Sequence, residues 1–172
     1  SPDRVMSNYY LGDAYRFLRL NNKALEALMY ADKNSKGELK DKDSDIDLAI
    51  GKTYAAMDSL DLANKYFESA IKLYSEDYYS FYSIAYSLDK DLDNPKEAIK
   101  YYNRSIELNP SYFYNYRDRA EAYSKLALSN KDNYYQAIFD ITKAIEIKGD
   151  SGYLYFKRGN YKNSLGIDGD CE

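Results

Sequence analysis

The sequence predicts an all-α fold in which about four and a half helix–turn–helix repeats stack into one solenoid. Three observations support this prediction. Helix-forming residues such as Ala, Leu, Glu and Lys are plentiful, whereas the 172 residues include only 3 Pro and 8 Gly. Small residues recur in register along the chain, and large residues keep a constant distance from them.

Small residues form three ladders whose steps are 34 to 39 residues long. The first ladder consists of Gly12, Gly51, Ala85, Ala120 and Gly159. The second consists of Ala24, Ala63, Ala98 and Ala137, and the third of Ala31, Ala70, Ser105 and Ala144. The second and third ladders stay seven residues apart, which is about two turns of one helix face. We therefore expect Gly12 to face Ala24, and Gly51 to face Ala63, where two antiparallel helices approach closely.

Large residues mark the flanks of these close approaches. At a distance of three residues after a first-ladder position stand Tyr15, Tyr54, Leu88 and Tyr123. At a distance of four residues after a second-ladder position stand Leu28, Phe67, Tyr102 and Ile141. Spacings of three, four and seven describe two amphipathic helices in each repeat. Because a single pair of helices cannot bury both of its faces, each repeat is expected to stack on the next.

The phase of the ladders places the repeats in order. We expect a single array over residues 5–172, with repeats at 5–38, 44–77, 78–112 and 113–151, a partial repeat at 152–172 and an acidic linker at 39–43. Asn94-Pro95 predicts the start of a helix and Asn109-Pro110 predicts its end. Extra residues near 127–135 predict a polar loop.

The last repeat is interrupted. Cys171 falls in a second-ladder position and is expected to be a small packing residue rather than a reactive thiol. A repeat that stops there would expose an apolar face, so we expect the natural protein to continue.

The pattern resembles the tetratricopeptide repeat, a motif of two helices. The stretches that carry the resemblance are Ile50-Gly51 with Tyr54, Ala63, Phe67 and Ala70; Ile84-Ala85 with Ala98, Tyr102 and Pro110; and residues 116–149. The resemblance implies a right-handed α-α superhelix whose first helices line a concave groove for a peptide or a partner protein. By position, the implied groove residues are Tyr9, Asp13, Arg16, Phe17, Lys52, Tyr79, Tyr82, Tyr86, Lys90, Tyr114, Arg117, Glu121, Lys125 and Tyr153, with Asp45 and Leu48 beside them.

The 22 tyrosines allow two interpretations. They line a recognition surface, as Tyr does at many interfaces, or they reflect a compositional bias. The members of the family that hold the acidic C-terminus of heat-shock chaperones use a clamp of Lys, Asn, Asn, Lys and Arg. The corresponding positions in repeats one to three hold Tyr9, Asp13, Ala49, Tyr79 and Ser83, and the later repeats fail in the same way. A chaperone-tail adaptor is therefore not expected.

Composition and motifs argue against several other classes. The net charge of −4 disfavours nucleic acid as a partner, and no apolar run approaches the length of a membrane span. The absence of His excludes Ser-His-Asp and Cys-His catalysis, and no phosphate-binding Gly-rich loop is present. The alternating runs of Asp that start at Asp41 and Asp89 lack the Gly and Glu of a calcium loop, so we interpret them as solvated linkers. We expect no cofactor, no metal and no enzymatic activity.

The first hypothesis is therefore a protein–protein interaction scaffold with a Tyr-rich groove. The alternative is a structural module that self-associates, or stacks with further repeats, through its C-terminal end. The sequence leaves the compartment and the partner open, with a cytoplasmic protein slightly favoured over an exported one.

Overall fold

A computed structural model describes residues 1–35, 40–149 and 151–167. In these ranges the chain forms nine α-helices that pack pairwise as helix–turn–helix repeats, which confirms the all-α fold. The helices belong to two compact units, Ser1–Ser80 and Phe81–Glu172. The single array over residues 5–172 stays a prediction.

The first unit contains the first two repeats. Its helices are α1 (Pro2–Phe17), α2 (Asn21–Ser35), α3 (Lys40–Ala55) and α4 (Leu60–Leu73), followed by the first residues of α5 (Tyr78–Lys90). Contacts join α1 to α2, α3 to α4 and α2 to α3. Buried side chains of the first three helices form one core, to which Val5, Leu28, Ile46 and Ile50 contribute.

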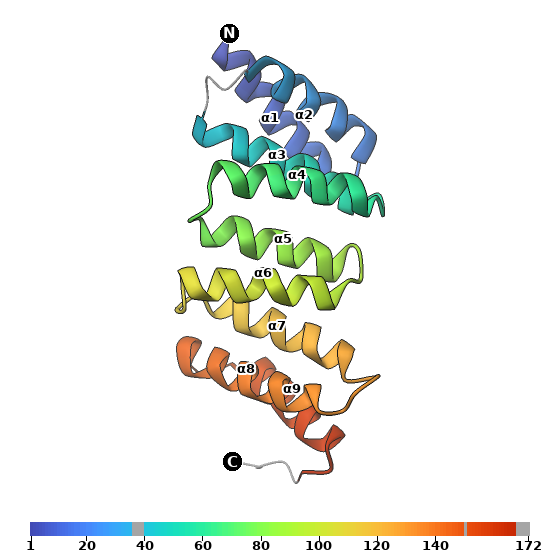
Figure 1. The fold of residues 1–172 in the computed structure, drawn as a ribbon, viewed down its shortest axis with the longest axis vertical. Coiled ribbons are helices and arrows are strands. Elements are labelled where there is room, and N and C mark those ends of the chain that lie inside the picture. Colours follow the sequence, from blue (N-terminus) through green and yellow to red (C-terminus); the bar gives the residue numbers. More distant parts are fainter. Residues whose placement is uncertain (36–39, 150, 168–172) are drawn as a thin grey trace. The chain divides into compact units, whose positions relative to one another are not determined.

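The second unit contains the rest of α5 and four further helices, shown in Figure 1. They are α6 (Pro95–Leu108), α7 (Phe113–Leu126), α8 (Asn133–Lys148) and α9 (Gly152–Ser164). Successive helices from α6 to α9 are in contact. The core of α7, α8 and α9 includes Tyr116, Ile141, Leu154 and Tyr161.

The small-residue ladders lie at the helix contacts, as predicted. A Cβ atom added to Gly12 would lie 2.5 Å from Leu28 Cγ and 3.2 Å from the carbonyl oxygen of Ala24. One added to Gly51 would lie 2.6 Å from the Phe67 ring and 3.2 Å from the carbonyl oxygen of Ala63. The second-ladder residues that the structure describes, Ala24, Ala63, Ala98 and Ala137, are all fully buried.

Gly159 is the exception in the first ladder, because an added Cβ atom would meet nothing within 4 Å. The residue that the sequence pairs with it, Cys171, lies outside the described residues. The interpretation of Cys171 as a packing residue is therefore still a prediction.

The linker differs from the sequence-based expectation of 39–43. Residues 40–43 form the start of α3, and residue 39 lies outside the described residues. The run contains Lys and Asp but no Pro or Gly, so nothing in it stops a helix. Lys42 also pairs with Asp45 one turn later, at 2.9 Å.

The predicted helix boundaries around α6 are confirmed. Asn94 Oδ1 accepts a hydrogen bond from the Glu97 amide at 3.3 Å, which caps α6, and Pro95 occupies its first position. The helix ends at Leu108, directly before Asn109-Pro110. The turn between α7 and α8 covers residues 127–132, within the predicted polar loop.

Candidate functional site

A hollow in the first unit brings together five of the predicted groove residues. It has a volume of about 150 Å³ and is lined by Tyr9, Asp13, Arg16, Asp45, Leu48, Ala49, Lys52 and Tyr79. The lining residues of α1 are spaced by four and three, and those of α3 by three or four, so each helix presents one face. Tyr79 reaches the hollow from the first turn of α5.

The polar side chains of the hollow balance one another in charge. The Arg16 guanidinium donates from Nε and Nη2 to Asp13 Oδ1, at 3.0 and 2.7 Å. Asp45 accepts from Lys42 at 2.9 Å. Burial, together with the nearby charges of Asp45 and Asp13, raises the pKa of Tyr9 to about 12, so its phenol stays neutral at physiological pH. The hollow therefore offers both donors and acceptors without a large net charge.

Phe17, another predicted groove residue, lies elsewhere. It is the last residue of α1, its side chain is 87% exposed, and it does not line the hollow.

The predicted groove residues of the second unit form hydrogen bonds and ion pairs with their neighbours. The Tyr82 hydroxyl donates to Asp118 Oδ2 at 2.9 Å, and the Arg117 guanidinium donates to both oxygens of Asp118, at 2.7 and 3.0 Å. Burial and the Asp118 carboxylate both raise the pKa of Tyr82. Asp118 is a buried carboxylate that needs such partners, because an unpaired charge in this position would be costly.

Glu121 is the centre of a second set of contacts. Its carboxylate lies 2.8 Å from Lys90 Nζ of α5 and 3.2 Å from Lys157 Nζ of α9. It also accepts from the Tyr153 hydroxyl at 2.6 Å. Burial alone would raise the pKa of Glu121, but these donors outweigh burial and lower its pKa to about 2. Glu121 thus links α5, α7 and α9 within the unit.

Asp89 extends this network and corrects one interpretation. The sequence places it in a solvated linker, yet it is fully buried at the end of α5. Its carboxylate pairs with Lys90 at 2.8 Å and with Lys125 at 3.0 Å. Lys125 also reaches Asp93 at 2.8 Å and the backbone carbonyl of Asp89 at 2.7 Å.

Tyr82 is also the centre of an aromatic cluster. Its ring centroid lies between 5.1 and 6.4 Å from those of Tyr86, Tyr102, Tyr112 and Tyr114. Tyr102 is fully buried. Tyr82 and Tyr102 therefore contribute to packing, whereas Tyr86 is partly exposed.

Sequence reasoning missed Asp118 and Asp140 as paired, buried acids. Asp140 accepts two hydrogen bonds from Arg119, at 2.6 and 2.7 Å. The sequence separation could have indicated the contact of Asp118, because Tyr82 and Asp118 stand 36 residues apart, which is about one repeat. Partners at one-repeat spacing on first helices are candidates for contact between neighbouring repeats.

The described residues contain no group of three or more His, Cys, Asp or Glu side chains that could hold a metal ion. Among the same residues, no helix combines the length and the apolar character that a membrane crossing requires.

Comparison with known proteins identifies the repeats. Residues 48–77 and 78–112 match the family model of the tetratricopeptide repeat. The UDP-N-acetylglucosamine–peptide N-acetylglucosaminyltransferase of Giardia intestinalis is 33% identical over 96 residues, which are 56% of this chain and 6% of the enzyme. The chain thus corresponds to a small part of that enzyme's length.

Solved structures share the fold along nearly the whole chain. The MamA protein has a TM-score of 0.72 and 20% identity, with 97% of this chain and 85% of MamA covered. A tetratricopeptide repeat protein from Parabacteroides merdae has a TM-score of 0.74 and 18% identity, with 95% and 61% covered. YrrB, described as a tetratricopeptide repeat protein with an unusual peptide-binding site, has a TM-score of 0.63 and 19% identity, with 92% and 76% covered.

These identities support a shared fold and say nothing of a shared ligand. The in-phase ladders, the pairwise helices, the two matched repeats and the structural likeness agree with one another. The chain contains tetratricopeptide repeats at residues 48–112 and shares the fold of tetratricopeptide repeat proteins along nearly its whole length.

Proposed function

We propose that this protein is an interaction scaffold that holds an extended segment of a partner protein at the hollow of the first unit. Tetratricopeptide repeat proteins generally mediate protein–protein interactions. The observation that carries the proposal for this chain is the convergence of five predicted groove residues, from three helices, on one hollow.

The size of the hollow favours part of a larger partner over a small molecule. Its volume of about 150 Å³ is below the roughly 300–1,000 Å³ of typical small-molecule pockets. A peptide side chain with its flanking amides would occupy such a space while the rest of the segment runs along the helices. Tyr79, whose side chain is 50% exposed, offers an aromatic surface of the kind that often dominates binding energy.

The chemistry of the lining favours a polar, nearly neutral segment. Asp13 and Arg16 satisfy each other, and Asp45 has Lys42 as its partner. A strongly charged ligand would have to displace one of these pairs. Peptide N–H and C=O groups can use the same donors and acceptors without changing the charge of the hollow.

Peptide selection tests the proposal. Dodecapeptides are selected on the immobilised protein from a random phage library, and their dissociation constants are measured by fluorescence anisotropy. We expect Lys52→Ala and Tyr79→Ala each to weaken binding of the selected peptides at least tenfold, or about 1.4 kcal/mol. Lys72→Ala, which removes an exposed lysine of α4 outside the hollow, serves as the matched control.

Circular dichroism of each variant separates loss of the site from loss of the fold. Selected peptides that bind both variants as tightly as the wild type would refute the hollow as the site. A library that yields no specific peptide would refute the proposal as a whole.

Self-association is a second candidate, favoured by exposed aromatic residues of the second unit. Tyr135 and Phe139 lie one turn apart on α8, and Tyr155 and Phe156 are exposed on α9. Exposed apolar groups in such numbers often mark an interface. Sedimentation velocity decides between the candidates, because a protein that stays monomeric at high concentration does not assemble through these residues.

A further inference from the structure

The turn inside the first repeat departs from the turns of the next two. Each of these turns has one residue with a left-handed backbone, at Arg19 (φ 58°), Asp58 (φ 57°) and Asp93 (φ 45°). Asp tolerates this conformation better than most side chains because its short polar group can bond locally. Arg has no such compensation, so the residue type at position 19 does not suit its backbone.

The following residue departs as well. It is the N-cap of the second helix, and its carbonyl accepts the first helical hydrogen bond in all three repeats, at Leu20, Ser59 and Asn94. Ser and Asn are favoured N-caps, whereas Leu is among the poorest. Two adjacent residues of the first repeat therefore break local rules that the next two repeats keep. Residues of this kind are expected at functional sites.

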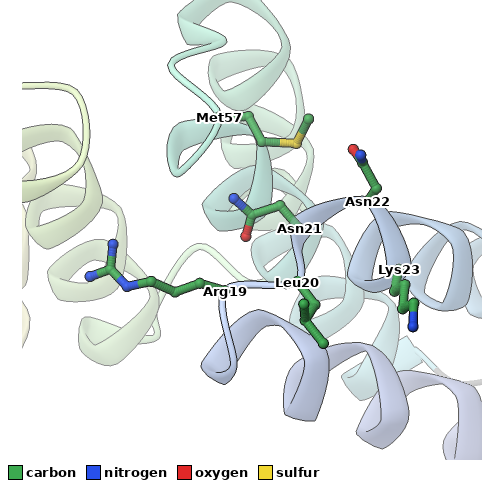
Figure 2. A pocket seen from close by; sticks show the side chains of 6 residues that line it. All are labelled: Arg19, Leu20, Asn21, Asn22, Lys23 and Met57. Atoms are coloured by element: carbon green, nitrogen blue, oxygen red, sulfur yellow. The ribbon is translucent and has the colours of Figure 1, made fainter.

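Both residues line the same pocket. It has a volume of about 490 Å³ and is formed by Arg19, Leu20, Asn21, Asn22, Lys23 and Met57. The Asn21 side chain donates to the Ala56 carbonyl at 3.3 Å and so joins the α1–α2 turn to the α3–α4 turn. Figure 2 shows Asn21 between the two turns, Met57 on the opposite turn and Arg19 extending outward. None of these residues belongs to the hollow lined by Tyr9 and Lys52.

The pocket is cationic with apolar walls. Arg19 and Lys23 line it and no carboxylate does, although the whole chain has a net charge of −4. Within the described part of the chain, neither cation forms an ion pair, and Lys23 lies over the Tyr15 ring at 5.8 Å. Leu20 is 43% exposed and Met57 is 38% exposed, so both present apolar surface to an incoming group.

We propose that this pocket binds a segment of another protein in which an Asp or Glu stands next to a bulky apolar residue. The carboxylate lies against Arg19, whose charge complements its own, and Lys23 adds to the positive charge of the pocket. The apolar side chain packs on Leu20 and Met57 and removes their exposed surface from water. The acid alone or the apolar group alone would use only half of the pocket.

Four pools of synthetic octapeptides test this specificity. The pools combine acidic with apolar, acidic with polar, basic with apolar, and neutral polar with apolar residues. Amide chemical shifts of the isotope-labelled protein report where each pool binds. We expect only the acidic–apolar pool to shift the amides of residues 18–23 and Met57, and the shifts to weaken at high salt.

A double variant separates binding from folding. Arg19→Asp with Leu20→Ser installs the residue pair that the second repeat holds at Asp58-Ser59. We expect the melting temperature to rise by roughly 2–4 °C, because the turn gains a better left-handed residue and a better N-cap. Binding of the acidic–apolar pool should fall at least tenfold. Lys131→Asp, an equal change of charge in an exposed loop, should leave binding unchanged.

Three outcomes would overturn the proposal. The acidic–polar pool could bind as well as the acidic–apolar pool, which would reduce the site to charge attraction. The shifts could map to Tyr9, Lys52 and Tyr79, which would assign the peptides to the hollow. The double variant could bind as tightly as the wild type, which would show that Arg19 and Leu20 have no role in recognition.

Discussion

Gly51→Ala tests the close helix approach on which the repeat depends. An added Cβ atom would lie 2.6 Å from both Cδ1 and Cε1 of Phe67, a side chain with no exposed surface. That is about 1 Å closer than the 3.5–4.0 Å optimum for two carbon atoms. The Ala63 carbonyl oxygen, at 3.2 Å, limits movement in a second direction. Helix α3 or the Phe67 ring must therefore shift.

The magnitude follows from two opposing effects. Ala in place of Gly inside a helix stabilises it by about 1 kcal/mol. Overpacking a tight core costs about 1–3 kcal/mol. We expect a net loss of about 1 kcal/mol in the free energy of unfolding. At Gly159 in α9, where an added Cβ atom meets nothing within 4 Å, the same substitution should be stabilising by about 1 kcal/mol.

Urea unfolding followed by circular dichroism measures both variants. The double variant Gly51→Ala with Phe67→Leu should lose less stability than the sum of the two single variants. We expect this difference, the coupling energy, to be at least about 0.5 kcal/mol. If Gly51→Ala stabilised the protein as much as Gly159→Ala, the close approach would not be a packing constraint, and the reasoning from the ladders would be refuted.

Three further variants probe the polar contacts. Arg119→Met should destabilise the protein by about 3–5 kcal/mol in urea unfolding, because it leaves the buried carboxylate of Asp140 without its partner; a loss below about 1 kcal/mol would contradict this. The pKa of Glu121, lowered to about 2 from an ordinary 4.5, adds stability that is present above pH 4.5 and lost as the pH falls toward 2. In acid titrations of stability, Glu121→Gln should remove roughly 3 kcal/mol of this pH dependence; an unchanged profile would show that the pairing with Lys90 does not persist in solution. Asn94→Ala should cost about 1 kcal/mol through loss of the α6 cap, measured by thermal unfolding, and no change in melting temperature would reject the cap as a source of stability.

The helix contacts could be predicted from the sequence because they depend on periodicity alone. The ladders place Gly12 opposite Ala24 and Gly51 opposite Ala63, with the large residues Leu28 and Phe67 on the flanks, whatever the side-chain rotamers are. The start of α3 could not be predicted in this way. Charged residues suit a linker and an exposed helix equally well, and contacts such as the 3.0 Å bond from Ser44 to the Ala70 carbonyl decide between them.

The sequence predicts which residues of the candidate site share a helix face, but it does not predict which side chains they contact. The face that carries Tyr9, Asp13 and Arg16 follows from helix geometry. Whether a polar residue on such a face pairs across one repeat depends on the reach of its side chain, as the hydrogen bond from Tyr82 to Asp118 illustrates. Asp47 illustrates the same limit, because it is buried and accepts a 2.5 Å hydrogen bond from Ser69 in place of an apolar contact.

The central claim is that a partner segment binds in the hollow between α1, α3 and the start of α5. Amide chemical shifts, recorded while a peptide from the selection is titrated into the isotope-labelled protein, test it most directly. We predict the largest changes at Tyr9, Asp13, Lys52 and Tyr79. Changes confined to other helices, with these amides unmoved at saturation, would contradict it.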